Sequence, residues 1–133
     1  MDTKLDLMVM TVHPDDAELG AGGTIAKYVA SGKKVGIIDL TKGEHGTRGT
    51  EVTRAQEAKA AAKILGVAIR ENLGLRDGFF VNEEASQRII IQSIRKYKPE
   101  IVITNALDDR HPDHGRASKL VNDSIFLAVL RRI

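Results

Sequence analysis

Short apolar segments alternate along the chain with longer segments in which apolar residues recur at helical spacing. The short segments, rich in β-forming residues, predict buried strands at residues 5–12, 35–40, 67–73 and 101–105. The longer segments predict helices at residues 23–31, 50–65, 84–97 and 114–132. This alternation predicts an α/β fold, Rossmann-like and doubly wound, with a mainly parallel sheet and helices on both faces.

Glycine and threonine mark several of the expected helix ends. Gly32 and Gly66 stand where a helix commonly ends in a left-handed residue, and Thr50 or Thr53 is the expected cap of the second helix. The segment Gly20-Ala21-Gly22-Gly23 is expected to lead into the first helix. The last helix reaches residue 132 without a glycine or a cap, so we expect residues 1–133 to be one domain that lacks its C-terminal part or receives a sheet edge from a partner.

The composition of the chain argues against several classes of function. The chain has 133 residues, 42% of them hydrophobic, and a formal net charge of +2, which is too small to favour nucleic-acid binding. It has no cysteine, so disulfides and thiolate metal sites are excluded. No apolar segment is long enough to span a membrane, and the N-terminus shows no signal-peptide pattern. We expect a cytoplasmic protein that binds neither nucleic acid nor membrane.

Two clusters of metal-binding residue types follow predicted strands. His13-Pro14-Asp15-Asp16 follows the first strand, and His111-Pro112-Asp113-His114 follows the fourth. The carboxyl ends of parallel strands meet at one edge of a sheet, where sites are commonly built. A hydrolytic metal usually has three histidine or carboxylate ligands and one open position, and His13, Asp16 and His114 supply that set.

The residues beside this expected ligand set can move protons. Asp15 has no ligand duty, so it could take a proton from metal-bound water, whose pKa the metal lowers. Asp113 could orient His111 by accepting one ring proton, and a charged His111 could stabilise an oxyanion and later protonate a leaving amine.

The two clusters together resemble the LmbE/PIG-L family of zinc-dependent N-acetylglucosamine deacetylases, and within it the branch of bacillithiol biosynthesis. The resemblance covers nearly the whole chain. Further segments that resemble the family are Asp39-Leu40-Thr41-Lys42-Gly43-Glu44, Gly46-Thr47, Arg54 with Glu57, Asn72-Leu73-Gly74, Arg76-Asp77-Gly78 and Arg110. Ala17 departs from the common HPDDE form of the first motif, at a position that is not an expected ligand.

The resemblance implies a function and a set of roles. It implies zinc on His13, Asp16 and His114, with iron(II) able to use the same ligands. It also implies Asp15 as general base, His111 with Asp113 near the oxyanion, and an amino-sugar substrate, N-acetylglucosaminyl malate, that is contacted by Arg54, Asp77 and Arg110. Hexamers are known in the family, so self-association is expected as well. Family members usually continue beyond this length with elements that help to wall the substrate pocket.

Three other functions use some of the same residues. Two histidines and a carboxylate also form the facial triad of non-haem Fe(II) oxygenases. A Rossmann-type nucleotide-binding module would use the glycine segment and a helix N-terminus for phosphate, but would leave the second cluster unexplained. A fragment that folds without turning over substrate is the third alternative.

Overall fold

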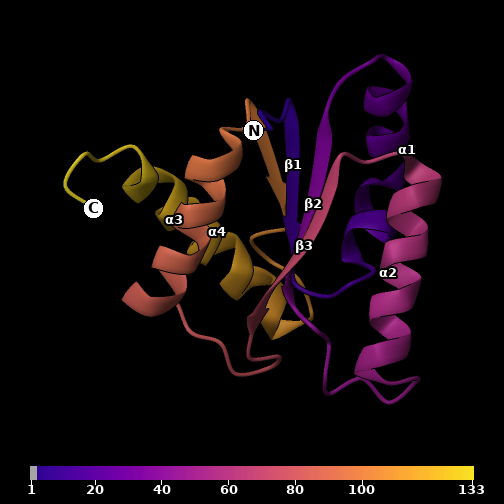
Figure 1. Cartoon of the computed structure of the whole chain (residues 1–133). Coiled ribbons are helices and arrows are strands. Elements are labelled where there is room, and N and C mark those ends of the chain that lie inside the picture. Colours follow the sequence, from indigo (N-terminus) through magenta and orange to yellow (C-terminus); the bar gives the residue numbers. More distant parts are fainter. Residues whose placement is uncertain (1–2) are drawn as a thin grey trace.

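The computed structural model describes residues 3–133, which form four strands and four helices in strict alternation (Figure 1). The predicted order of elements is confirmed. In chain order, the elements are β1 (Leu7–Thr11), α1 (Asp16–Ala30), β2 (Val35–Thr41), α2 (Glu51–Leu65), β3 (Ile69–Leu75), α3 (Glu84–Tyr97), β4 (Ile101–Thr104) and α4 (Pro112–Ala128).

The four strands form one parallel sheet in the order β3-β2-β1-β4. β1 is central, and its Leu7 is in register with Val35 of β2 on one side and Ile101 of β4 on the other. All residues of β1 and β2 are buried, because helices cover both faces of a parallel sheet. The strands that precede the two histidine clusters are therefore direct neighbours.

The core has one layer on each face of the sheet. In Figure 1, α1 and α2 lie on one face and α3 and α4 on the other. Met8 and Ile38 pack with Ile90 of α3 and Leu120 of α4, whereas Val9 packs with Ile25 of α1. Since alternate residues of a strand point to opposite faces, one apolar strand supplies both layers.

Two helix ends follow the local rules that the sequence suggested. The Thr50 side chain accepts a hydrogen bond from the backbone of Thr53 at the start of α2, and Gly66 ends that helix with a φ of 77°. The end of α4 is different. It stops at Ala128, and Arg95 of α3 donates to the carbonyls of Ala128, Leu130 and Ile133, so a side chain from a neighbouring helix holds the expected uncapped end.

The predicted start of the first helix was wrong. α1 begins at Asp16, seven residues before the expected start at Gly23, and contains the glycine segment. Backbone hydrogen bonds from Asp15 to His13 and from Leu19 to Asp15 form the first turn before the glycines are reached. Glycine weakens a helix by about 1 kcal/mol per residue but does not stop one that has already begun.

The bounds of other elements also differ from the prediction, most of all those of β3 and α4. β3 lies two residues later than expected, and α4 spans 112–128 instead of 114–132. Pro112 accounts for the earlier start of α4, because proline fits the first position of a helix, where its missing N–H leaves no bond unmade. Within residues 3–133, none of the helices is long and apolar enough to cross a membrane.

Candidate active site

The adjacency of β1 and β4 brings the two histidine clusters together at the carboxyl edge of the sheet. His13, Asp16 and His114 each offer one ligand atom, and these atoms lie within 4.8 Å of one another. Oδ2 of Asp16 lies 3.4 Å from Nδ1 of His13 and 3.2 Å from Nε2 of His114. Two imidazole nitrogens and a carboxylate oxygen therefore converge on one point.

Each of these two imidazoles is held through its other nitrogen. Nε2 of His13 lies 3.0 Å from Oδ1 of Asp77, and Nδ1 of His114 lies 2.8 Å from Oδ2 of Asp109. Such carboxylate contacts fix the tautomer and the orientation of histidines that bind metals. The nitrogens left over, Nδ1 of His13 and Nε2 of His114, are the two that face Asp16.

The carboxylate of Asp16 is positioned by the backbone of one strand end and a side chain from the other. The backbone N–H of His13 donates to Oδ2 over 3.0 Å, and the amide of Asn105 donates to the same oxygen over 3.4 Å. Asn105 also accepts a hydrogen bond from the backbone of Val12. Asn105 thus joins the ends of β1 and β4 beside the converging ligands.

The charges of this cluster support one another. Burial lowers the pKa of His13, but the hydrogen bond and charge of Asp16, together with Asp77, outweigh burial and raise the pKa above its ordinary value. Burial raises the pKa of Asp16, and the contacts with His13 and His114 outweigh it and lower the pKa. Asp16 and His13 therefore each favour the charged form of the other.

The residues fit a divalent cation. Nε2 of His114 is buried and has no hydrogen-bond partner in the described part of the chain, although it faces a carboxylate oxygen. A buried nitrogen without a partner is costly, and a metal ion would satisfy it. Histidine with carboxylate is a common donor set for zinc and for iron(II).

Asp15 lies next to the ligand Asp16 in sequence but does not join the ligand group. Its side chain is half exposed, and its Oδ2 lies 3.9 Å from Nη2 of Arg54. Arg54 also donates to the carbonyl of Gly43 in the loop after β2. The guanidinium expected to contact substrate therefore faces the expected general base.

The expected pairing of the His111 ring with the Asp113 carboxylate is not formed. The backbone N–H of Asp113 donates to Nδ1 of His111 over 3.2 Å, because His111 caps the N-terminus of α4. The buried Asp113 carboxylate instead accepts bonds from the backbone of Gly78 and the guanidinium of Arg116. Since Nδ1 accepts, a neutral His111 carries its proton on Nε2.

The structure gives Asp77 a different contact from the one expected. Asp77 is buried, and its two oxygens are used by His13 and by the backbone of His45, so it contacts an expected ligand where a contact with substrate was predicted. Glu44 completes this arrangement by accepting a bond from the backbone of Asp77. Arg110 is exposed on the loop before α4.

Two residues that orient the cluster were not identified from the sequence. Asp109 holds His114, and Asn105 holds Asp16. The acidic pair Asp108-Asp109, which Arg110 separates from the second histidine cluster, was an available signal for the role of Asp109. Asn105, directly after β4, was included in the predicted strand and given no role.

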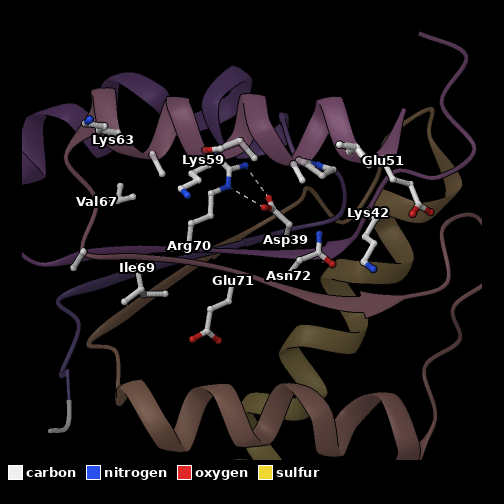
Figure 2. Close-up of a pocket in the computed structure, with 16 residues that line it drawn as sticks. Asp39, Lys42, Glu51, Lys59, Lys63, Val67, Ile69, Arg70, Glu71 and Asn72 are labelled. Carbon is white, nitrogen blue, oxygen red and sulfur yellow. Dashed lines mark hydrogen bonds and ion pairs between the residues drawn. The ribbon is translucent and has the colours of Figure 1, made fainter. Parts of the chain in front are cut away.

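Two hollows border this region. A groove of about 410 Å³ between α1 and the end of β4 is lined in part by Asp16, Asp109 and His114. A cavity of about 630 Å³ lies between α2 and the edge strand β3, with Asp39 and Arg70 at its base (Figure 2). None of the three converging ligands lines this second cavity, so the groove is the one that opens onto the cluster.

Comparison with protein-family models gives one match that covers most of the chain. The PIG-L model, described as GlcNAc-PI de-N-acetylase, matches residues 8–125. Diacetylchitobiose deacetylase of Thermococcus kodakarensis is 35% identical over 128 residues, which cover 89% of this chain and 48% of the relative. The chain spans about half the length of this curated relative.

Solved structures show the same fold. A conserved protein of Thermus thermophilus has a TM-score of 0.92 and 44% sequence identity, over 96% of this chain and 58% of that chain. The 4-carboxy-2-hydroxymuconate hydratase of Pseudomonas putida has a TM-score of 0.80 and 26% identity, over 96% of this chain and 57% of that chain. Both contain further chain outside the matched part.

Proposed function

The chain belongs to the PIG-L family, and on this premise we propose that it carries the site of a metal-dependent amide hydrolase that removes acetate from an N-acetylglucosamine conjugate. One observation carries the proposal. The ligand atoms of His13, Asp16 and His114 lie within 4.8 Å of one another, and Asp15 stands beside them without ligand duty. Three ligands and a free carboxylate are what a hydrolytic metal site needs.

We propose that His13, Asp16 and His114 hold zinc, with iron(II) as the other metal that these ligands accept. When bound, such a metal polarises a carbonyl group and makes water more acidic. Asp77 and Asp109 keep the two imidazoles oriented for this purpose.

Asp15 is the proposed general base. Its half-exposed side chain can reach solvent, and Arg54 places a positive charge 3.9 Å from its carboxylate. It takes a proton from the attacking water while the water oxygen bonds to the acetamide carbon. The C–N bond then breaks, the proton passes to the sugar nitrogen, and the products are acetate and a free amine.

His111 and Asp113 act on the carbonyl side of the reaction in this proposal. His111 offers its Nε2 proton to the carbonyl oxygen as negative charge develops there. The backbone N–H of Asp113 supports this role by donating to Nδ1 of His111. The Asp113 carboxylate accepts a bond from the backbone of Gly78, in the loop that carries Asp77. Arg54 and Arg110 are the proposed contacts to the sugar or its substituent.

The favoured substrate is N-acetylglucosaminyl malate, and the relatives support amino-sugar amides as a class. The family model is described as GlcNAc-PI de-N-acetylase, and the 35% identical relative is named as a diacetylchitobiose deacetylase. The solved structure at 26% identity is named as a hydratase, so the names of similar proteins include more than one reaction. The test must therefore separate metal binding from deacetylation.

The experiment is elemental analysis of the purified protein, followed by acetate release from N-acetylglucosaminyl malate and from diacetylchitobiose. We expect about one zinc per chain, as one ligand set of three predicts, and release of acetate that stops when the metal is chelated. Metal binding without acetate release from either compound would overturn deacetylation and leave the metal centre standing. A chain that binds no added zinc or iron(II) would overturn both.

A further inference from the structure

A buried arginine joins three elements behind the proposed metal centre. Arg70 lies on β3, and its side chain is only 7% exposed. It donates from Nε and Nη2 to both oxygens of Asp39 on β2, over 2.9 and 3.0 Å (Figure 2). It also donates from Nη1 and Nη2 to both oxygens of Glu18 on α1, over 2.9 and 3.1 Å. One guanidinium thus makes two bidentate pairs.

The position of Glu18 gives this network its significance. Glu18 lies in the first turn of α1, two residues after the proposed ligand Asp16. The contacts of Asp16 with His13 and Asn105 hold this turn to the ends of β1 and β4, and Ala17 is buried against the sheet. Among the described residues, the Asp15 side chain makes no capping hydrogen bond at this end of α1. The Arg70–Glu18 pair adds the contact that joins this turn to β3 and, through Asp39, to β2.

The other partner of Arg70 lies in the buried part of the sheet. Asp39 is buried on β2, the strand between β1 and β3, and every residue of that strand is buried. Arg70 also reaches the carbonyl of Ala58, the residue of α2 that is buried. The first turn of α1 is thus connected through one side chain to the sheet and to α2.

We propose that Arg70 is a positioning residue for the metal centre: by binding Glu18 and Asp39 together, it fixes the first turn of α1 and so the carboxylate of Asp16. This inference rests on the proposed function, because Asp16 is a proposed ligand. Residues that orient ligands typically change metal affinity by about 10- to 100-fold when they are lost. Arg70 would act in this way without contacting the metal.

The test is zinc affinity by competition with a chromogenic chelator, measured without substrate. Arg70→Met keeps the length of the side chain and removes its charge, and we expect a loss of affinity of about tenfold or more. Arg70→Lys should restore only part of it, because an ammonium group cannot bind two carboxylates in bidentate fashion. Arg88→Met, at the exposed ion pair with Glu84 on α3, is the matched control and should leave zinc affinity unchanged.

Loss of a buried charge could also lower stability, and a second pair of variants separates the two effects. Glu18→Gln keeps the shape at a partly exposed position and should weaken zinc binding in the same direction as Arg70→Met. Ile90→Ala creates a cavity on the other face of the sheet, at a buried residue of α3. We expect Ile90→Ala to lower the melting temperature and leave zinc affinity of the folded protein unchanged.

The outcomes separate this inference from the proposed function. Wild-type zinc affinity in folded Arg70→Met or Glu18→Gln would overturn the positioning role while leaving the metal centre intact. An equal loss of affinity in Ile90→Ala would also overturn it, because the effect would then be one of stability. If the wild-type chain binds zinc and releases no acetate, the deacetylase proposal fails and the affinity comparison still decides the role of Arg70.

Discussion

His13 and Asp77 form a hydrogen bond, with Nε2 of His13 3.0 Å from Oδ1 of Asp77, although they follow strands that are not neighbours in the sheet. His13 follows β1 and Asp77 follows β3, so the loops from these strands meet in front of β2. The second oxygen of Asp77 accepts the backbone N–H of His45. A carboxylate that looked available to substrate is therefore used to orient a histidine.

This contact predicts that Asp77 controls metal affinity. Asp77→Ala frees the His13 ring to rotate and removes the acceptor for Nε2–H, so we expect zinc affinity to fall about 10- to 100-fold. The measurement is chelator competition on the folded protein. Asp108→Ala, an exposed acid in the loop before α4, serves as the control and should keep the wild-type affinity. Unchanged zinc binding in Asp77→Ala would contradict the role given to this contact.

Alanine variants of Asp15 and His114 should distinguish the catalytic role of one residue from the metal-binding role of the other. Asp15→Ala removes the proposed base but none of the three ligands, so zinc content should stay near that of the wild type while acetate release falls by about 100-fold or more. His114→Ala removes a ligand and should lose both zinc and activity. Metal content and acetate release are measured on the same preparations. Undiminished turnover by Asp15→Ala would rule out its assignment as base.

Two helical glycines should respond to alanine in opposite ways. A Cβ at Gly115 of α4 would lie 2.9 Å from the backbone oxygen of Leu107, so Gly115→Ala must displace the loop that carries Asp109. We expect a loss of about 1–3 kcal/mol in the free energy of unfolding, together with weaker zinc binding through His114.

Among residues 3–133, no atom lies within 4 Å of a Cβ placed at Gly20 of α1, so Gly20→Ala should raise the free energy of unfolding by up to about 1 kcal/mol. Chemical denaturation of the two variants side by side gives the comparison. If both variants were stabilised, the close approach of the loop to α4 would not constrain the protein.

The buried carboxyl group of Asp39 should make the free energy of unfolding depend on pH. Burial raises its pKa to about 6 from an ordinary value of 3.8, and Arg70 opposes the shift without cancelling it, while Glu18 and Asp16 add to it. The folded state therefore binds a proton more readily than the unfolded state. Proton binding by Asp39 therefore stabilises the folded state by up to about 3 kcal/mol. This stabilisation is fully present below about pH 4 and is lost as the pH rises through about 6.

The measurement for this prediction is urea denaturation at pH 4.5 and at pH 7 for the wild type and for Asp39→Asn. The asparagine cannot titrate, so the wild type should lose more stability between these two pH values than the variant does. Equal losses would show that Asp39 titrates at the same pH in the folded and unfolded states.

The sequence was sufficient for those parts of the fold that depend on local pattern. Apolar strands such as β1 and β2 alternate with helices whose ends are marked by residues such as Thr50 and Gly66, and this pattern predicted the parallel sheet. It also predicted that His13 and His114 would meet, because both clusters follow strands. The start of α1 was missed, because three glycines obscured a helix that the turn after His13 had already begun.

The contacts around the ligands were harder to predict because they depend on strand order. Asp77 reaches His13 only because β3 lies two positions from β1, and sequence distance gives no sign of that. The Asp113 carboxylate was assigned to His111 on proximity in sequence. In the structure, the start of α4 turns its backbone N–H toward His111 and leaves the carboxylate for Gly78 and Arg116.

The placement of β1 beside β4 has a consequence for folding as well as for chemistry. Asp16 and His114 come from opposite ends of the chain, so an ion that binds both acts as a reversible cross-link that closes a long loop. A ligand that binds only the folded state raises stability with its free concentration. The melting temperature of this protein should therefore rise as free zinc rises and fall when a chelator is added, and a thermal scan can detect metal binding without any substrate.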